Sequence, residues 1–318
     1  MDALGDRMKL YEGRESDRRC MLNLPVCARL GGRAFHSFTR GLERPYDRNF
    51  SELMLEVLKY LVEETGACTG YTQSDEISLI FRGSTLESQI FFDGRIQKMV
   101  STLAAMASVK FNRIMPSYLP DSKHTKMPTF DCRVWEVPDR TEATNVLVWR
   151  EQDATKNSIS MAAQSVFSHR DLHGKNCSQM QDMLMEKGIN WNDYPDFFKR
   201  GVYVQRRRVV RKFTSEELEK LPEKHEARKN PDLMVERSVV VPLEMPVFTR
   251  VLNRIGVVFE GKEPIVLKED SEKRNPERSV KVLCPECGGG KISVLCDTCS
   301  WDNNGEKAEQ FRTGFQEG

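Results

Sequence analysis

The sequence predicts an α+β fold, in which an antiparallel sheet of the ferredoxin-like kind is backed by helices. Two observations predict it. Short apolar stretches alternate at the strand period of two while longer ones repeat at helical spacing. Their order along the chain is strand, helix, hairpin, helix, strand, which is the ferredoxin-like order. A mixed, partly helical region and a small module resembling a zinc ribbon follow this first part.

Residues 1–140 carry the ferredoxin-like pattern. The predicted elements are a strand over 26–30, a helix over 50–62, a hairpin over 68–82, a second helix over 96–111 and a strand over 130–137. Gly66 is a stop signal after the first helix, and Pro138 follows the last strand. Polymerase palm domains use this arrangement, which puts Gly31 and Gly32 beside Asp75 on adjacent strands.

Residues 141–255 form the second predicted region. Long apolar periodicity over 143–167 predicts a helix, and 201–213 and 238–241 are typical of strands. Charged and helix-breaking residues predict a linker over 256–280.

The C-terminal part predicts a metal-binding module over 281–301 and a flexible tail over 302–318. Its two Cys-x-x-Cys pairs, eight residues apart, can supply four thiolates to one tetrahedral zinc ion. Disulfides or a redox pair are the competing interpretations. The predicted zinc ligands are Cys284, Cys287, Cys296 and Cys299.

Composition favours a globular protein of the cytoplasm. Apolar residues make up 39% and charged residues 30% of the chain, and the net charge is +1. No apolar run reaches about eighteen residues and no apolar signal region opens the chain, so we expect no membrane partner and no secretion. With so small a net charge, RNA binding needs local basic patches, the densest of which covers residues 205–212.

Two adjacent carboxylates stand out, Asp75 and Glu76. They come where the alternation of Ile77, Leu79 and Phe81 begins a strand. Rigid carboxylates at a strand end suit magnesium-dependent phosphoryl transfer, because magnesium takes oxygen ligands and bridges to substrate phosphates. A solvated acidic turn is the alternative. Adjacent strand residues point to opposite faces, so both can reach one metal only at a turn or bulge.

Several motifs together resemble the tRNA-His guanylyltransferase family, the template-dependent 3′-to-5′ RNA polymerases. They are the stretches 26–39, 44–47, 72–81, 130–134, 149–158 and 167–175, whose order and spacing match over residues 5–203. Thr155 stands where the eukaryotic branch has a histidine, so the chain is more similar to the bacterial and phage branch.

The resemblance implies the roles of individual residues. It implies nucleotide contacts by Gly31, Gly32, Arg33, Ala34, Phe35, His36, Arg44, Asp47, Ser74, Asp75, Lys98, Asp153, Lys156 and Asn157. It implies RNA contacts by Arg95, Arg133, His169, His173 and Lys175. Asp75 and the backbone carbonyl of Gly32 are the implied magnesium ligands, with Glu76 as a second catalytic carboxylate.

Gly31 departs from the family pattern. The family's first strand ends in Asp-Gly-Arg, and that aspartate is one of two metal-holding carboxylates, whereas glycine has no side chain to offer. An inactive relative, a deliberate substitution, or rescue by Glu76 or a substrate phosphate would each explain it. Lacking a carboxylate, the site would neutralise less charge in the transition state.

The resemblance implies an enzyme that adds nucleotides to the 5′ end of tRNA, in tRNA repair or maturation, with GTP or ATP as substrates and magnesium as cofactor. The family is oligomeric, so we also expect a homo-oligomer, a dimer or a tetramer. The alternative is an inactive relative that binds RNA or nucleotide. A role in protein interaction through the zinc module is a third possibility.

Overall fold

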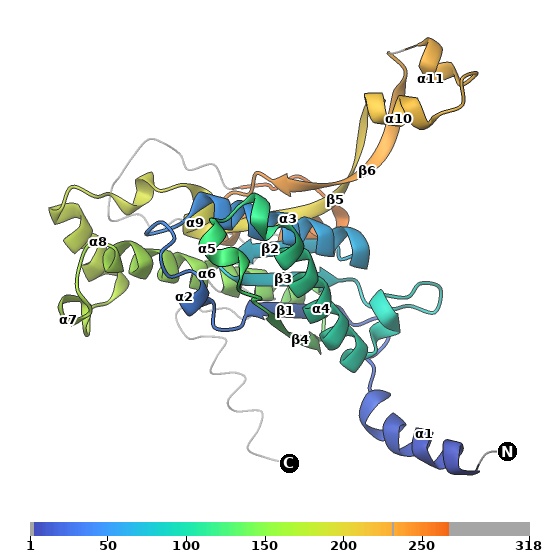
Figure 1. The fold of residues 1–318 in the computed structure, drawn as a ribbon, viewed down its shortest axis with the longest axis horizontal. Coiled ribbons are helices and arrows are strands. Elements are labelled where there is room, and N and C mark those ends of the chain that lie inside the picture. Colours follow the sequence, from blue (N-terminus) through green and yellow to red (C-terminus); the bar gives the residue numbers. More distant parts are fainter. Residues whose placement is uncertain (1–2, 231, 267–318) are drawn as a thin grey trace, which may run out of the picture. The chain divides into compact units, whose positions relative to one another are not determined.

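The computed structural model describes residues 3–230 and 232–266 (Figure 1). These residues belong to one compact unit, residues 1–267. The predicted zinc module, the predicted tail and the predicted linker from residue 267 onward lie outside the described residues.

The strands form one antiparallel sheet in the order β4-β1-β3-β2-β5-β6. Their bounds are β1 Val26–Gly32, β2 Thr69–Gln73, β3 Glu76–Phe81, β4 Phe130–Glu136, β5 Val202–Lys212 and β6 Met234–Leu243. The first four strands have the ferredoxin-like order β4-β1-β3-β2, with β1 and β3 in the centre. The predicted mixed fold with an antiparallel sheet is therefore confirmed.

Helices cover the sheet and extend the fold beyond it. Their bounds are α1 Ala3–Ser16, α2 Phe35–Phe38, α3 Arg48–Thr65, α4 Ile96–Ile114, α5 Asp121–His124, α6 Arg140–Gln164, α7 His169–Leu172, α8 Cys177–Glu186, α9 Asp196–Arg200, α10 Ser215–Lys220, α11 Glu226–Lys229 and α12 Arg254–Glu260. Short 3₁₀ turns are η1 Phe91–Gly94, η2 Met115–Ser117, η3 Trp191–Asp193 and η4 Phe248–Arg250.

Two apolar cores lie on opposite faces of the sheet. Leu30, Ile77 and Leu79 pack with α3 and α4 in the first, whereas Cys27 and Ile80 pack with α6 and α12 in the second. Neighbouring strand residues alternate between the two cores, as the period of two requires. A third core joins the end of α6 to α8 and α9.

The helix α3 has the ends that its sequence favours. Asp47 caps its N-terminus by accepting a hydrogen bond from the Phe50 amide, and Gly66 ends it in the left-handed conformation at φ 69°. The predicted stop at Gly66 is thus found in the structure.

The region after residue 140 continues the same sheet, because β5 pairs with β2 and β6 pairs with β5. Beyond the sheet, β5 and β6 run on as a two-stranded arm that carries α10 and α11 (Figure 1). Residues 256–260, where the sequence predicts the start of a linker, belong to α12. Val257, Val258 and Phe259 are buried there, and this apolar run explains the difference.

No helix among the described residues combines the length and the apolar character that crossing a membrane requires.

Candidate active site

Two turns meet where β1 ends. The amide of Gly32 donates to the carbonyl of Asp75 at 3.1 Å, and Gly31 stands opposite Glu76 in the pairing of β1 with β3. Asp75 follows Ser74, whose φ of 53° turns the two-residue hairpin loop between β2 and β3. The sheet thus brings the glycine pair beside Asp75, as the order of elements predicts.

The turn after β1 leaves backbone donors free. Ala34 adopts the left-handed conformation at φ 56° directly before α2. No group that the structure describes accepts a hydrogen bond from the amides of Ala34 or His36. Successive amides in such a turn form a concave site for an anion.

The two glycines of this turn differ in the space around them. A Cβ on Gly32 would lie 2.3 Å from the Phe35 ring, whereas one on Gly31 would meet only Asp131 Oδ1 at 3.9 Å. Phe35 is 2% exposed and packs against Phe38, Phe111 and Phe130 at centroid distances of 5.1 to 5.4 Å. Gly32 is therefore required by the packing, but Gly31 is not.

A cavity of about 490 Å³ opens at this edge of the sheet. Its lining comes from the β1 turn and α2, the loop 39–47, the β2–β3 turn, the end of α6, and α9. The residues on it include Gly32, Ala34, Phe35, His36, Arg44, Tyr46, Asp47, Ser74, Asp75, Met161, Gln164, Phe197 and Phe198. Tyr46 contributes an aromatic wall with Phe197 and Phe198, whose ring centroids lie 5.2 and 4.9 Å from its own.

Asp75 is the carboxylate of the cavity that lies beside the glycine pair. Burial raises its pKa, and hydrogen bonds from its own backbone and from the Ser74 hydroxyl oppose the rise. A carboxylate that water solvates poorly gains more from a cation, so its position suits a metal ligand.

Glu76 points to the opposite face of the sheet. Arg150 Nε donates to Glu76 Oε1 at 2.5 Å and Arg150 Nη2 to Asp153 Oδ2 at 2.8 Å, while Arg29 lies 3.8 Å away. Burial raises the pKa of Glu76 and the two arginines oppose the rise. Arg150 is nearly buried, so this cluster locks α6 against the end of the sheet.

A second hollow of about 470 Å³ lies on the α6 face, away from the first cavity. Arg29 and Arg133, paired across β1 and β4, line it together with Trp135 and Trp149. The guanidinium of Arg29 stacks over Trp149 at 5.2 Å. Arg133 is exposed and has only a 3.5 Å ion pair with Asp131.

Comparison with known proteins identifies this arrangement. A family model described as tRNAHis guanylyltransferase matches residues 5–138. A bacterial tRNA-His guanylyltransferase-like protein solved in complex with ATP is 41% identical, with a TM-score of 0.59 over 64% of this chain and 87% of that one. The chain belongs to the tRNA-His guanylyltransferase family.

Further similar proteins match over comparable lengths. A bacterial family member in complex with GTP is 33% identical, with a TM-score of 0.60 over 78% of this chain and 94% of that chain. The tRNA(His) guanylyltransferase of Saccharomyces cerevisiae is 28% identical over 206 residues, which are 58% of this chain and 84% of the relative. An uncharacterized protein of Acanthamoeba polyphaga mimivirus is 31% identical over 230 residues, 65% of this chain and 78% of that protein.

Several residues that the guanylyltransferase resemblance assigns to nucleotide or RNA lie apart from the cavity. The backbone of Arg95 forms an isolated β-bridge with that of Arg19 beside the start of α4, and the amide of Ile96 donates to the carbonyl of Arg18. This segment lies at the Val26 end of β1, because Met21 donates to Glu136, the partner of Val26. Arg95 and Lys98 are therefore at the opposite end of the strand from Gly32.

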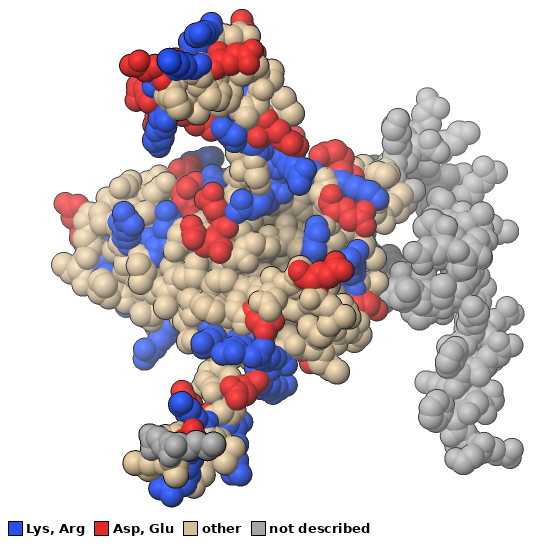
Figure 2. Space-filling model, turned by 90° about the vertical axis from the view of Figure 1, so that its right-hand side faces the viewer, with Lys and Arg blue, Asp and Glu red and all other residues tan. Residues whose placement is uncertain are grey.

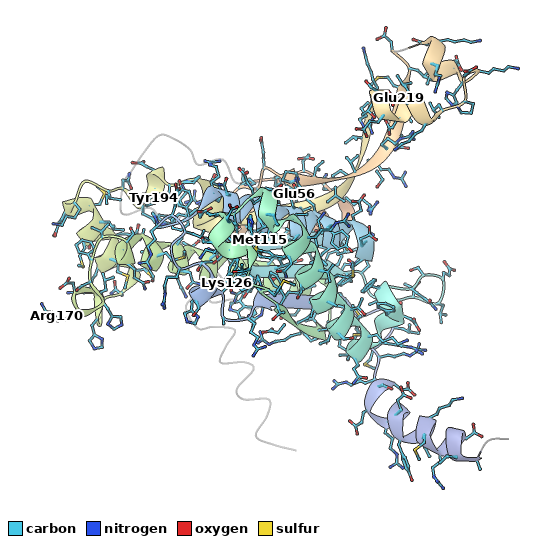
Figure 3. All side chains as sticks on the ribbon, viewed as in Figure 1. Glu56, Met115, Lys126, Arg170, Tyr194 and Glu219 are labelled. Atoms are coloured by element: carbon cyan, nitrogen blue, oxygen red, sulfur yellow. The ribbon has the colours of Figure 1, made fainter. Side chains whose placement is uncertain are left out.

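The predicted residues on and after α6 are also spread out. Lys156 and Asn157 are exposed on α6, one to two turns before the residues that line the cavity. His169 and His173 sit on α7 with centroids 6.4 Å apart, and Arg170 beside them marks the outer end of that segment in Figure 3. Neither these histidines nor Lys175 line the cavity, and they form a separate basic turn.

Asp47 has a different position from the one expected of a ligand. It lines the cavity, but its Oδ1 accepts from Phe50 and its Oδ2 from Glu43 at 3.3 Å. Both oxygens thus hold the loop that precedes α3.

Sequence reasoning missed Arg29, Arg150, Gln164, Phe197 and Phe198. Arg150 carried a usable signal, since a charged residue interrupting an apolar helix needs a partner. The aromatics of α9 carried none, because their contact with Tyr46 spans more than 150 residues.

Proposed function

We propose that this chain is a 5′-end nucleotidyltransferase of tRNA that adds nucleotides in the 3′-to-5′ direction, in tRNA repair or maturation. The observation that carries the proposal is the pairing of free backbone donors at Ala34 and His36 with the Asp75 carboxylate in one cavity. The backbone donors suit a triphosphate, and the volume of the cavity lies within the range of about 300 to 1,000 Å³ typical of ligand sites.

Within that cavity, the triphosphate would lie along the β1 turn from Gly32 to His36. Arg44 at its rim would add positive charge, and the aromatic wall around Tyr46 would face the nucleobase. The bacterial family member bound to ATP and the one bound to GTP support a nucleotide ligand of this kind.

The donor set at this edge fits magnesium only together with a substrate. Asp75 offers one carboxylate and Gly32 a backbone carbonyl, and no cluster of three His, Cys, Asp or Glu side chains among residues 3–230 and 232–266 could hold a metal. Magnesium commonly binds through one or two carboxylates plus substrate phosphates, which agrees with this set. When bound, it would neutralise charge on the transferring phosphate.

The proposed chemistry has two phosphoryl transfers. A 5′-phosphate oxygen of the RNA attacks a nucleoside triphosphate, with release of pyrophosphate. The 3′ hydroxyl of the incoming nucleotide then attacks the activated 5′ phosphate, and the nucleoside monophosphate leaves. This chain's residues would bind and orient the reactants, which accounts for most of the catalysis in such transfers.

The RNA would approach on the α6 face. Arg133 and Arg29 beside the exposed Trp149 offer charge and a stacking surface there, and both features suit nucleic acid. His169, His173 and Lys175 would extend the contact as a separate basic turn. These RNA contacts and a cytoplasmic location remain part of the proposal.

Calorimetry with GTP and with ATP in the presence of magnesium tests the proposal first. We expect the native protein to bind either triphosphate and Asp75→Ala to bind it more weakly. In a second assay, the native protein should add a labelled nucleotide to a tRNA that lacks its first nucleotide. Absence of triphosphate binding at millimolar concentration would exclude the proposed site.

A catalytically inactive, nucleotide- or RNA-binding relative is the second candidate, and Gly31 favours it. The same experiments separate the two. Tight binding of triphosphate and tRNA without any nucleotide addition, at protein concentrations stoichiometric with the tRNA, identifies the inactive relative.

A further inference from the structure

Lys123 carries a buried ammonium group that pairs with no carboxylate among the residues that the structure describes. It lies on α5 and is 5% exposed. Its Nζ donates to the carbonyl oxygens of Phe38 and Arg40, each at 2.6 Å, and lies 5.5 Å from the centre of the Phe38 ring. A buried charge is costly unless its hydrogen bonds are satisfied, so these two carbonyls are what make a lysine tolerable at this position.

The two carbonyls lie between α2 and the cavity. Phe38 ends α2, and Arg40 is the second residue of the loop 39–47, which we name the entrance loop. Nearly every residue of this loop lines the cavity. Carbonyls at a helix end have no partner within the helix and attract a cation, which Lys123 provides from a separate element.

The entrance loop is held by different residues at its start and at its end. Lys123 holds its first residues, and Asp47 holds its last through the amides of Glu43 and Phe50. Between these points lies Gly41, with φ at 90° and no atom within 4 Å of an added Cβ. Without the first contact, the start of the loop would keep its local hydrogen bonds, from Thr39 to Phe35 and from Leu42 to Thr39. Asp47 and the packing of Tyr46 on α9 would still hold its end.

We propose that Lys123 is a positioning residue, which holds the entrance loop in the conformation that binds the nucleoside triphosphate. This inference rests on the proposed function. It predicts an effect on nucleotide affinity rather than on the chemical step, because Lys123 touches neither the cavity nor the groups around Asp75.

The test compares Lys123→Met with Lys126→Met. Methionine keeps the apolar stem of Lys123 but removes both donors, whereas Lys126 is exposed three residues further on and is labelled in Figure 3. We expect Lys123→Met to raise the Kd for GTP and ATP about ten- to a hundredfold, since hydrogen bonds from charged groups have that weight. The turnover number at saturating nucleotide should change less than about threefold, and Lys126→Met should change neither.

Hydrogen exchange of the nucleotide-free proteins tests the positioning role separately from the proposed function. Amides of residues 39–47 should exchange faster in Lys123→Met, while those of β1 and β3 keep their rates. Lys123→Arg, which retains donors, should restore part of the protection. Lys123→Gln, which removes the charge and is too short to keep both hydrogen bonds, takes the place of the methionine variant should that fail to fold.

The outcomes are distinct. Unchanged exchange in the entrance loop, or faster exchange throughout the sheet, overturns the positioning role even when the native protein binds no nucleotide. Native protein that binds no triphosphate counts against the proposed function instead. Binding by the native protein with an equal Kd for Lys123→Met overturns the inference alone.

Discussion

The edge of the sheet at Gly32 and the arm formed by β5 and β6 both contain groups suited to phosphate, but they differ in how far those groups are already engaged within the protein. At the edge, the amides of Ala34 and His36 have no partner among the described groups. On the arm, Arg206 donates to the carbonyl of Glu63, Arg207 to that of Gly261, and Arg211 to Glu217. The densest basic run of the sequence is thus largely engaged within the protein.

The difference teaches that a count of charges predicts a binding surface poorly. Arginine stems and guanidinium groups on the arm connect β5 to α3, α10 and the end of α12, which is a structural use of positive charge. Figure 2 shows acidic and basic side chains interspersed over the described surface on that side of the molecule, without a continuous basic field. The turn after β1, by contrast, binds through backbone groups that no count of lysines and arginines includes.

The largest effect should come from Asp75→Asn, which removes the carboxylate beside Gly32 while keeping the shape of the side chain. We expect nucleotide addition to fall about 10²- to 10³-fold, because a preorganised charge is lost. Burial raises the pKa of Asp75, so activity of the native protein should decline with falling pH at a higher pH than for an exposed aspartate. Single-turnover rates with a labelled 5′ phosphate between pH 5 and 8 measure both.

Asp153→Asn is the matched control for Asp75→Asn. It also removes one carboxylate near the site, but Asp153 is bound to Arg150 on the other face of the sheet. An equal loss of nucleotide addition in both variants would mean that the carboxylate of Asp75 has no specific role in the reaction.

Gly31→Asp should raise nucleotide addition by about a hundredfold, the converse of losing about 3 kcal/mol of charge stabilisation. The position can accept the side chain, because a Cβ there meets only Asp131 Oδ1 at 3.9 Å. Gly31→Ala adds the Cβ without the charge and should leave activity unchanged.

Gly32→Ala is the steric control for the same turn. Its Cβ would lie 2.3 Å from the Phe35 ring, so we expect a loss of about 1 to 3 kcal/mol in unfolding free energy by denaturant titration.

Fast addition by the native chain, with no gain in Gly31→Asp, would place the second carboxylate elsewhere, with Asp131 and Glu76 as candidates because both pair with Gly31.

Much of the fold could be predicted because it depends on local patterns. The periodicity of residues 50–62 and 96–111 predicts the helices α3 and α4, and Gly66 predicts the end of α3, as the structure has it. The pleat argument left open whether a turn lets Glu76 join Asp75, and in the structure Glu76 bonds to Arg150 on the far face. The site beyond Asp75 depends on contacts such as Lys123 with Phe38, which no local pattern encodes.

The resemblance assigns roles to residues along the chain and does not give their positions in space. It grouped Lys98 with the nucleotide ligands, whereas the start of α4 lies at the Val26 end of β1. The antiparallel pairing of β1 with β3 accounts for this position, because β3 ends at Phe81 opposite Val26 and the chain continues from there to α4.

A smaller effect should separate the α6 face from the arm in tRNA binding. Arg133→Gln should weaken binding and reduce the slope of log K against log salt by about one, because one phosphate contact is lost. Arg206→Gln should change that slope little, since its guanidinium already bonds to Glu63. Filter binding at several salt concentrations measures both slopes. An equal reduction of the slope in the two variants would show that the arm also binds RNA.

The smallest effect should be confined to the arm and concerns Glu217. Arg211 donates to both of its oxygens at 2.7 and 2.9 Å, Arg237 donates at 3.1 Å, and these bonds hold the pKa of Glu217 well below its ordinary value of 4.5. A lowered pKa in the folded state stabilises the arm above the ordinary value and less as the pH falls toward the lowered one. Glu217→Gln should therefore speed amide exchange in residues 209–237 at pH 7. Lowering the pH toward 3 should reduce the difference in amide protection between the variant and the native protein. Nucleotide addition should not change, because the arm's arginines serve its own structure; a loss of addition in Glu217→Gln would show instead that an ordered arm is needed at the active site.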